Sequence, residues 1–316
     1  MNILITGIHG FVGTNLLKAL GEKHQIWGLD IVQKSVPNLI RTYSWEELDS
    51  LPNEKMPAID VVIHLAGKAH DVKNTSEASE YFKVNYDLTC RIFDWVVRNG
   101  VSKFIFFSSV KAAADYVNED VLTEDVVPCP VGPYGESKIA AEKYIQENIV
   151  KLSAEQRVYI LRPAMIHGPG NKGNLNLLYN VVSKGIPWPL GAFDNSRSFT
   201  SIDNLTYALS ALIKGNAASG VYNMCDDAPL STTRLVELIC QTLGKKARVW
   251  SINKNLIEKV ASVGSTLRLP LNKSRLQKLT ENYVVSNAKI KTAIGIDSFP
   301  VTSEDGIRHT LRSFTE

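Results

Sequence analysis

Short apolar runs alternate with longer amphipathic segments through the first two-thirds of the chain. The apolar runs are continuous and rich in β-branched and aromatic residues, which is typical of strands covered on both faces. They predict six strands: Asn2–Thr6, Ile26–Asp30, Val61–Ala66, Phe104–Ser108, Val158–Arg162 and Val221–Cys225. The amphipathic segments predict four helices: Val12–Gly21, Ala78–Arg98, Tyr134–Ile149 and Asn204–Lys214. Such alternation of strand and helix predicts an α/β fold with a doubly wound parallel sheet.

The pattern changes after Gly168. The following stretch, 169–197, is rich in Gly, Pro and Asn, with one helical pattern at Leu175–Lys184. Further on, the pattern predicts separate helices with little strand between them: Thr232–Leu243, Leu256–Gly264 and Ser303–Phe314. We therefore expect a dinucleotide-binding domain from 1–169 plus 200–225. A smaller, mostly helical lobe, 170–199 plus 226–316, should cover the carboxyl edge of the sheet, where such sheets bind ligands.

Composition narrows the class of protein. The chain has 316 residues, of which 44% are hydrophobic and 21% charged, as in ordinary globular proteins. A formal net charge of +3 is too small to indicate a nucleic-acid or membrane-surface partner. The four cysteines form no Cys-x-x-Cys pair, so we expect no metal or disulfide framework and a reducing, cytoplasmic location. No signal peptide and no apolar run of about 18 residues is present, so no membrane span is predicted.

A glycine-rich turn joins the first predicted strand to the first predicted helix. Gly7 permits a tight turn, Gly10 lets the backbone approach a pyrophosphate, and Gly13 lets the helix pack closely on the strand. The N–H groups and partial positive charge of a helix N-terminus favour phosphates. A glycine-rich turn is often only a turn, but this one follows the first strand directly, which favours a dinucleotide site.

Asp30, at the end of the second predicted strand, bears on the choice between NAD and NADP. A carboxylate there accepts hydrogen bonds from both ribose hydroxyls and repels a 2′-phosphate. No arginine occurs in Ile31–Gln33, so NAD is favoured, although Lys34 keeps NADP open and Asp30 can also cap a turn. The small residues of Leu65-Ala66-Gly67 would let the backbone touch the adenosine side of a cofactor, and core packing explains them almost as well.

Tyr134 and Lys138 lie one turn apart on the same face of a predicted helix. A nearby ammonium favours the phenolate and lowers the pKa of a tyrosine from about 10 toward the working pH. Tyr134 can then take a proton from a hydroxyl during hydride removal and return it during reduction. Tyr-x-x-x-Lys is also common on solvated helices. Ser109 favours the catalytic interpretation, because it ends a buried strand and can orient the reacting oxygen, with a helix or turn cap as the alternative.

Taken together, these motifs resemble the extended short-chain dehydrogenase/reductase family, in its NAD-dependent nucleotide-sugar epimerase/dehydratase branch and UDP-glucose 4-epimerase-like subgroup. The resemblance covers nearly the whole chain. It rests on Thr6-Gly-x-x-Gly-Phe-Val-Gly13, Asp30, His64-Leu-Ala-Gly67, Asn85, Ser109, Tyr134-x-x-x-Lys138, Arg162-Pro163, Gly168-Pro-Gly170 and Arg197-Ser-Phe-Thr-Ser-Ile-Asp203.

The resemblance implies a role for each matching residue. Tyr134 becomes the general acid/base, Lys138 lowers its pKa and binds the nicotinamide ribose, and Ser109 aligns the substrate oxygen. The implied cofactor-binding residues are Gly7, Gly10, Phe11, Val12, Gly13, Asp30, Leu65, Ala66, Gly67, Asn85, Tyr134 and Lys138. The implied substrate-binding residues are Ser109, Lys111, Asn174, Pro189, Leu190 and Arg197. Among these, Arg197 and Asn174 fall at the nucleotide diphosphate, Pro189 and Leu190 at the uracil, and Lys111 near the sugar or free in solvent.

Three places depart from the family pattern. His167 stands where the family usually has Tyr before Gly-Pro-Gly, which leaves the contact on the nicotinamide side open. The stretch Arg41–Leu48 looks irregular, so we assign no adenine contact there. A second diphosphate-binding arginine has no clear match, with Arg275 and Lys278 as candidates.

The residues after Ser109 narrow the reaction that the resemblance implies. Family members that eliminate water carry an Asp-Glu pair at this place, where this chain has Val110 and Lys111, so a 4,6-dehydratase is disfavoured. We expect an epimerase acting at C4 of a UDP-hexose or UDP-N-acetylhexosamine through a transient 4-keto sugar, in the sugar supply of surface polysaccharides. An NAD(P)H-dependent 4-ketoreductase of a UDP-4-keto-6-deoxy-hexosamine is the alternative. Asp30 favours the epimerase, since epimerases retain NAD whereas reductases often prefer NADPH.

A dinucleotide-sensing protein without catalysis is a second alternative, because a fold does not imply a function. The presence of Ser109, Tyr134 and Lys138 argues against it. The resemblance also implies a homodimer built on the helices at Ala78–Arg98 and Tyr134–Ile149, whose isoleucines fit either an interface or packing within one chain. We expect no nucleic acid and no membrane among the partners.

Overall fold

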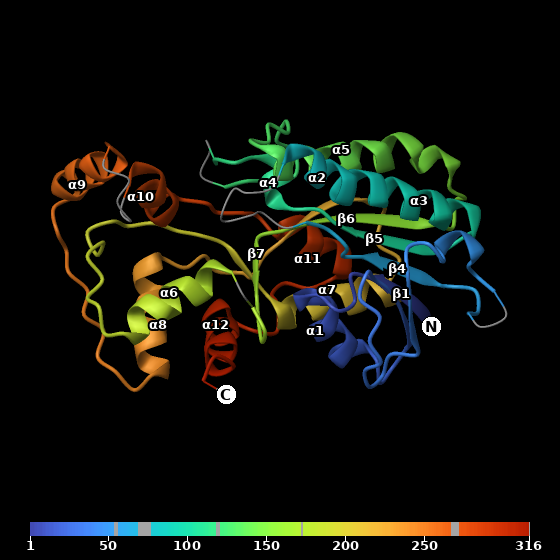
Figure 1. Ribbon diagram of the computed structural model, residues 1–316, viewed down its shortest axis with the longest axis horizontal. Coiled ribbons are helices and arrows are strands. Elements are labelled where there is room, and N and C mark those ends of the chain that lie inside the picture. The colour runs from blue at the N-terminus through green and yellow to red at the C-terminus, as the bar shows by residue number, and fades with distance from the viewer. Residues whose placement is uncertain (54–55, 69–76, 118–120, 172, 267–271, 316) are drawn as a thin grey trace.

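A seven-stranded parallel sheet forms the larger part of the molecule in the computed structural model, which describes residues 1–53, 56–68, 77–117, 121–171, 173–266 and 272–315 (Figure 1). Its strands lie in the order β3-β2-β1-β4-β5-β6-β9, and every neighbouring pair is parallel. Their bounds are β1 Asn2–Thr6, β2 Gln25–Leu29, β3 Arg41–Tyr43, β4 Val61–His64, β5 Lys103–Phe107, β6 Arg157–Pro163 and β9 Gly220–Met224. The order reverses between β1 and β4, where doubly wound sheets bind ligands.

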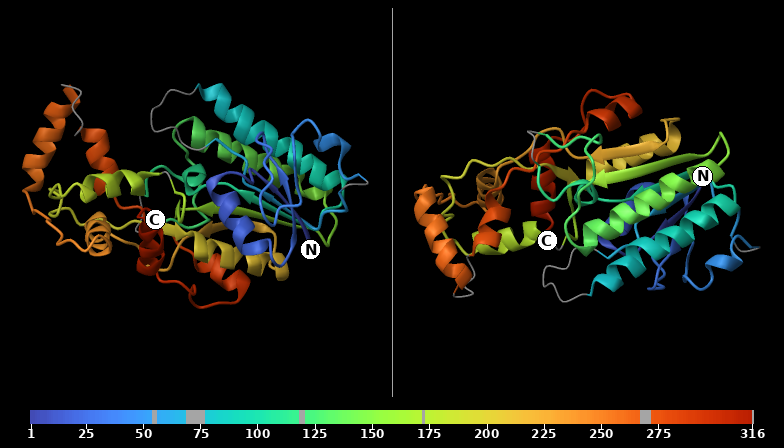
Figure 2. Two further views of the ribbon diagram at one scale, coloured as in Figure 1. Left: turned by 60° about the horizontal axis from the view of Figure 1, so that its bottom comes forward. Right: turned by 90° about the horizontal axis from the view of Figure 1, so that it is seen from above.

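Helices cover both faces of this sheet (Figures 1 and 2). Alternate residues of a strand point to opposite faces, so Ile3 and Ile5 of β1 join one core and Leu4 joins the other. The first core contains residues of α1 (Phe11–Leu20), α7 (Ile202–Lys214) and α11 (Ala288–Ile294). The second contains residues of α3 (Leu88–Arg98) and α5 (Pro133–Asn148). Shorter elements complete this part: η1 Leu48–Ser50, α2 Ala78–Phe82, the π-helical η2 Lys83–Asp87, α4 Val110–Ala113 and η3 Ile149–Lys151.

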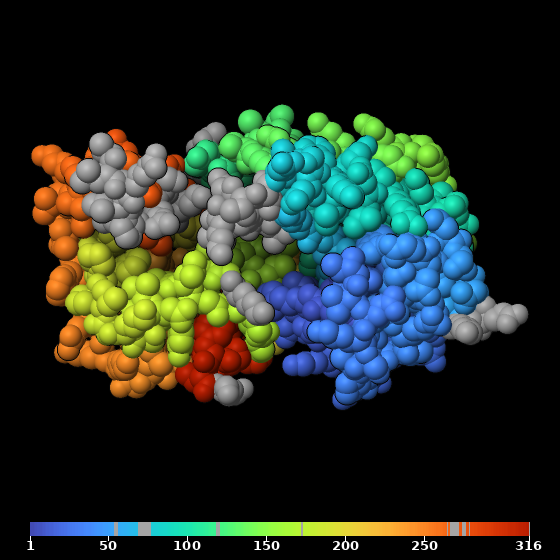
Figure 3. All heavy atoms as spheres, viewed as in Figure 1, coloured from blue at the N-terminus to red at the C-terminus, as the bar shows by residue number. Residues whose placement is uncertain are grey.

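A smaller lobe lies at one end of the sheet (Figure 1). It has its own apolar core, which contains Leu175, Phe199, Leu235 and Ile307. Its elements are α6 Asn174–Ser183, α8 Thr232–Thr242, α9 Lys254–Thr266, α10 Lys273–Thr280 and α12 Ser303–Arg312, beside a short parallel pair, β7 Met165–His167 and β8 Phe199–Ser201. Figure 3 shows a hollow between this lobe and the blue N-terminal residues.

The predicted α/β fold and doubly wound sheet are confirmed, and each predicted strand and helix overlaps an observed one. The prediction was wrong for Arg41–Leu48, because β3 occupies its first three residues, and it overlooked β7 and β8. Strands of three residues show too little alternation to be detected. The helix predicted over Ala78–Arg98 is divided by η2.

The division into domains stays a prediction, with one observation that bears on it. Ile290 of α11 and Phe299 pack into the core under the large sheet, together with residues of α7. This C-terminal stretch therefore returns to the part of the molecule that contains the large sheet. The four cysteines are free. Among the helices of the described residues, none has both the length and the apolar character needed to cross a membrane.

Replacing Gly13 by alanine should destabilise the protein. A Cβ at Gly13 would lie 2.5 Å from the carbonyl oxygens of Gly7 and Ile8, so the turn or α1 must move. We expect the free energy of unfolding in urea to fall by about 1–3 kcal/mol. Gly10→Ala is the matched control, since its Cβ would lie 3.2 Å from the nearest backbone atom and should cost less. Equal stability of Gly13→Ala and the wild type would show that the packing of α1 on the turn is loose.

Candidate active site

The glycine-rich turn lies against the end of β4. Gly7 has a φ of +68°, which favours glycine, and its N–H donates to the Leu29 carbonyl at 2.9 Å. A Cβ at Gly7 would lie 2.9 Å from the Ala66 nitrogen. Gly10 precedes α1 and provides no capping side chain, so the first N–H groups of α1, from Phe11 to Gly13, remain for another acceptor. Two of the predicted cofactor segments are thus in direct contact, beside a helix N-terminus suited to phosphates.

Asp30 is buried beside this turn. Its carboxylate accepts hydrogen bonds from the His9 N–H at 3.0 Å and from the Val32 N–H at 3.1 Å. The bond to Val32 is the turn cap that the sequence left as an alternative. The bond to His9 fixes the carboxylate next to the glycine-rich turn. The same side chain therefore shapes the turn and presents an anion where a dinucleotide ribose would lie.

The structure brings the three predicted catalytic residues together. Ser109 caps α4, accepting from the Lys111 N–H at 3.2 Å, and its side chain is also hydrogen-bonded to Tyr134. The Lys138 Nζ is buried and donates to the Phe107 carbonyl at 2.8 Å. A Cβ at Gly67 would lie 3.2 Å from this Nζ. The side chains of Ser109, Tyr134 and Lys138 therefore lie on the same edge of the sheet as the turn after β4.

The acid–base properties of Tyr134 differ from the prediction, which expected a lowered pKa. In the structure the pKa of Tyr134 is raised, chiefly by burial, although the hydrogen bond with Ser109 acts in the opposite direction. Burial also lowers the pKa of Lys138 to about 8, while Glu142 counteracts this shift. The predicted direction is wrong because burial of the phenol outweighs the groups that lower its pKa, and Lys138, which donates to the Phe107 carbonyl, is not among those groups. A positive charge beside the phenol, as on an oxidised nicotinamide, favours its ionised form.

Asn85 connects Tyr134 to the loop after β4. It is buried in the π-helical turn η2, and its Oδ1 accepts from the Lys68 N–H at 2.7 Å. Its Nδ2 donates to the Ser137 Oγ at 3.0 Å, and Ser137 donates in turn to the Tyr134 carbonyl at 2.9 Å. Asn85 therefore holds the two segments that flank the predicted nicotinamide site.

A buried ion pair behind Lys138 was not predicted. The Arg162 guanidinium donates to both carboxylate oxygens of Glu142, with its Nη2 2.6 Å from Oε2, and both side chains are almost fully buried. Ser108 donates to the same carboxylate. The signal was present in the sequence, because Tyr134, Lys138 and Glu142 follow one another at intervals of four on one helix face.

Arg197 lies in the lobe on a backbone segment held from both sides. It exchanges two backbone hydrogen bonds with Leu230, and the neighbouring residues Ser196 and Ser198 pair with Tyr283. Its guanidinium is one-quarter exposed and lies 3.9 Å from a Glu281 carboxylate oxygen. Burial lowers the pKa of Arg197. A partly exposed, oriented guanidinium of this kind suits a diphosphate.

The remaining predicted substrate residues differ in how far their side chains are exposed. Asn174 is exposed at the first residue of α6, and Pro189 is half-buried. Leu190 packs inside the lobe core, so its side chain does not present an open surface. Lys111 is held by Asp115, with its Nζ 2.9 Å from the carboxylate, and it lies over the ring of Tyr283.

His167 lies in the interior of the molecule. Its Nδ1 is 2.8 Å from the Thr310 hydroxyl of α12, and its Nε2 is 3.5 Å from an Asp226 oxygen. The ring is fully buried. His167 therefore connects β7 to α12. At the position where the family usually has Tyr, this chain has a side chain that packs between these two elements.

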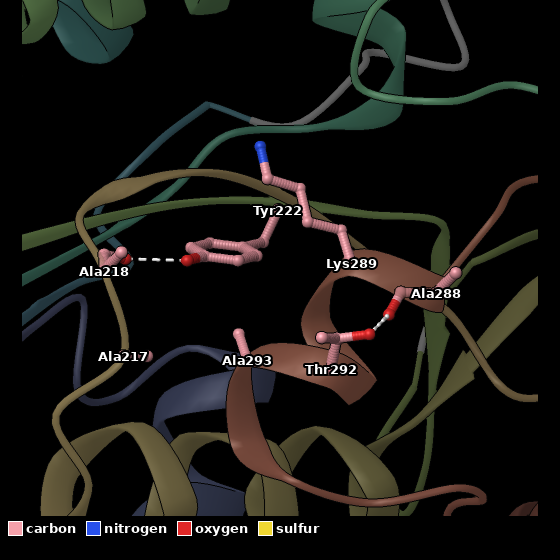
Figure 4. Close-up of a pocket in the computed structure, with 7 residues that line it drawn as sticks. All are labelled: Ala217, Ala218, Tyr222, Ala288, Lys289, Thr292 and Ala293. Atoms are coloured by element: carbon pink, nitrogen blue, oxygen red, sulfur yellow. Dashed lines mark hydrogen bonds between the residues drawn. The ribbon is translucent and has the colours of Figure 1, made fainter.

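A separate recess of about 480 Å³ lies between β9 and α11 (Figure 4). Its lining includes four alanines, the ring of Tyr222 and the side chain of Lys289. Tyr222 donates to the Ala218 carbonyl at 2.6 Å. None of the predicted site residues lines this recess, and among the described residues no group of three or more His, Cys, Asp or Glu is arranged to hold a metal ion. The candidate active site is therefore the edge formed by β1, β4, β5 and α5.

Comparison with known proteins identifies the family of the chain. Residues 3–225 match the profile described as the NAD dependent epimerase/dehydratase family. The UDP-glucose 4-epimerase of Vibrio cholerae is 34% identical over 77% of this chain and 76% of its own length. The N-acetyl-alpha-D-glucosaminyl-diphospho-ditrans,octacis-undecaprenol 4-epimerase of Escherichia coli O157:H7 is 32% identical over 78% and 73%. Reductases are also similar, such as the GDP-6-deoxy-D-mannose reductase of Pseudomonas aeruginosa, 28% identical over 75% and 78%.

Solved structures share the fold of the whole chain. The structure of MoeE5 in complex with UDP-glucose and NAD aligns with a TM-score of 0.75 and 21% identity, over 100% of this chain and 99% of that one. The lobe and the sheet are therefore present together in this neighbour.

Replacing Lys138 by methionine should change how stability depends on pH. The pKa of Lys138 is about 8 in the folded protein and 10.5 when unperturbed, so the folded state binds fewer protons between these values. The buried ammonium therefore costs stability below pH 8, and this cost disappears as the pH rises toward 10.5. The stability gained by Lys138→Met, measured by urea unfolding, should shrink across this range. The control is Lys143→Met, which replaces an exposed lysine of the same helix. A pH-independent difference would contradict the lowered pKa.

Replacing Glu142 by glutamine should leave the Arg162 guanidinium buried without a counter-charge. We expect a loss of about 3–5 kcal/mol in the free energy of unfolding. The pKa of Lys138 should also fall further, because Glu142 is the group that raises it. The double variant Glu142→Met/Arg162→Met removes both charges and should recover much of the loss. A fully stable Glu142→Gln protein would argue that water reaches the pair.

Proposed function

The chain belongs to the NAD dependent epimerase/dehydratase family, and we propose that it is an NAD-dependent epimerase acting at C4 of a UDP-hexose or UDP-N-acetylhexosamine. The hydrogen-bonded pair Ser109–Tyr134, with Lys138 beside it, carries this proposal. Relatives named as 4-epimerases of sugar diphosphates support it. The reaction would proceed through a transient 4-keto sugar.

The residues around the glycine-rich turn fit NAD. The N-terminus of α1 suits the pyrophosphate, the close approach of Gly7 to Ala66 brings two proposed cofactor-binding segments together, and Asp30 suits a ribose without a 2′-phosphate. When bound, NAD would supply the reversible hydride acceptor for the sugar carbon. The lysine side chain of Lys138 would orient the nicotinamide ribose.

Tyr134 takes the proton from the C4 hydroxyl as the hydride leaves the carbon, and Ser109 holds the same oxygen. After the keto sugar has rotated in the site and presents its other face to the nicotinamide, Tyr134 returns the proton to the oxygen. No further acid or base is required, because the carbon inverted is also the carbon oxidised. Val110 and Lys111 follow Ser109, so the acidic pair of a dehydratase is missing.

We assign the diphosphate to Arg197 and Asn174, and the uracil to Pro189. Arg197 has the exposure and the charge for this role. Leu190 would act only as the packing beneath Pro189, since it is buried. Residues 1–169 plus 200–225 would bind NAD, and 170–199 plus 226–316 the UDP-sugar, with α11 as the exception described above.

We also propose a homodimer that acts in the cytoplasm in the sugar supply of surface polysaccharides. The four free cysteines suit a reducing compartment. The family resemblance supports the dimer. The isoleucines offered for the interface do not add support, because Ile139 and Ile145 are buried within one chain.

A 4-ketoreductase is the second candidate, favoured by the similarity to a nucleotide-sugar reductase. The same Ser109, Tyr134 and Lys138 would protonate the oxygen of a stable 4-keto sugar during its reduction. A non-catalytic dinucleotide sensor is the third, and it would need none of these side chains.

Incubation of the protein with NAD and a panel of sugar diphosphates should give the C4 epimer of one of them, detected by NMR. The panel contains UDP-glucose, UDP-N-acetylglucosamine and, because of the second relative, N-acetylglucosamine carried by a polyprenyl diphosphate. Tyr134→Phe should lower turnover by about a hundredfold or more while NAD binding persists.

Each other outcome selects another function. NADPH-dependent reduction of UDP-4-keto-6-deoxy-N-acetylglucosamine, without epimerisation, would decide for the reductase. NAD binding without exchange of any C4 hydrogen would decide for the sensor. Unchanged turnover in Tyr134→Phe would remove this residue from the mechanism.

A further inference from the structure

Positive charge is concentrated in one stretch of the lobe. Residues 245–278 contain nine Lys and Arg and a single acid, Glu258, which gives a net charge of +8. The whole chain carries +3, so the remainder carries −5. Among the basic residues, Lys245, Lys246, Lys254 and Lys259 are exposed. The lobe therefore has a strongly positive region that the net charge of the chain conceals.

The helix α9 lies within this stretch. Its apolar residues occupy two adjacent faces, and the lobe core covers only one of them. Ile257 and Ala261 are buried in the lobe core. Leu256, Val260 and Val263 recur at intervals of four and three, so they share a neighbouring face. Their side chains are 55%, 48% and 56% exposed. An ordinary surface helix keeps its apolar side chains on the core side, whereas here three of the five apolar side chains named face solvent.

The α9 face, defined as Leu256, Val260, Val263 and the adjacent Lys259, lies at one extremity of the molecule. Figures 1 and 2 show α9 at the end of the lobe opposite the large sheet in all three views. Lys259 is three residues after Leu256 and four before Val263, so an ammonium borders the apolar stripe. Trp250, a few residues before the helix, is 54% exposed. A flat surface can therefore reach this face.

We propose that the α9 face docks on the surface of an anionic phospholipid bilayer. Aliphatic side chains bordered by lysine match a membrane interface, where apolar residues enter the acyl boundary and ammonium groups meet anionic headgroups. The positive charge of 245–278 adds long-range attraction to such a surface.

Other occupants fit the observations less well. In a two-fold contact between copies, each α9 face would meet its own equivalent, which would bring two stretches of charge +8 together. Nucleic acid would use the lysines but leave the three aliphatic side chains unused. The expectation of no membrane partner relied on the net charge of the whole chain. That value of +3 is the sum of +8 in residues 245–278 and −5 in the rest of the chain.

Docking is independent of the proposed function, because the α9 face contains none of the candidate active-site residues. The full-length protein is sedimented with phosphatidylcholine vesicles, with and without phosphatidylglycerol, over a range of salt concentrations. We expect binding only to the anionic vesicles, decreasing with salt. Val260→Asp and Lys259→Glu should each lower vesicle affinity by about tenfold. Both positions are exposed, so activity toward a UDP-sugar, where present, should not change.

Matched controls sit on another surface. Val150, 83% exposed, is changed to Asp, and the exposed Lys151 to Glu, and neither should alter vesicle binding. Equal binding of the wild type and Val260→Asp, or binding without preference for anionic lipid, would overturn the proposal. Loss of a solution dimer in Val260→Asp would assign the face to a second copy instead. Binding of duplex DNA that Lys259→Glu weakens and Val260→Asp leaves intact would assign it to nucleic acid.

Discussion

The buried pair between Glu142 and Arg162 determines how α5 lies on the sheet. Glu142 is on α5, Arg162 is at the end of β6, and Ser108 at the end of β5 donates to the same carboxylate. Any rotation of α5 would separate charges that have no access to water, at a cost of several kcal/mol. Lys138 is one turn before Glu142 and Tyr134 two turns before it. This ion pair therefore fixes the helix that carries Lys138 and Tyr134, the proposed acid–base residues.

Tyr283 links the lobe to this arrangement. Its backbone pairs with Ser196 and Ser198, on either side of Arg197. Its hydroxyl donates to the Ala114 carbonyl at 2.7 Å, at the end of the short helix that Ser109 caps. One buried tyrosine thus connects the segment of Arg197, the proposed diphosphate-binding residue, with the helix capped by Ser109. Under the proposed function, Tyr283 would link the nucleotide-binding lobe to the residue that orients the sugar.

The sequence was most informative where the chemistry is local. The glycine-rich turn, the continuous apolar strands and the spacing of Tyr134 and Lys138 follow from neighbours in the chain, and all were found as predicted. Glu142 escaped because its partner is 20 residues away and a glutamate inside a helix usually faces solvent. The direction of the Tyr134 pKa shift escaped because it depends on burial of the phenol, which follows from packing between segments distant in the chain. Leu190 was assigned to the uracil, although its side chain packs in the lobe core, since a Pro-Leu pair in an irregular stretch gives no periodicity that would indicate burial.

The choice between epimerase and dehydratase rests on what surrounds Ser109. Elimination of water needs a second acid and base beside the sugar, whereas the residue after Val110 is a lysine whose ammonium already pairs with Asp115 and lies over Tyr283. That pairing engages the charge of Lys111 and is consistent with the proposed role of Tyr134 as the group that exchanges a proton with the substrate. One proton-transfer residue suffices for oxidation and reduction at a single carbon. An Asp30 carboxylate fixed by two backbone N–H groups suits the NAD that such a cycle retains, because its position is set before any cofactor arrives.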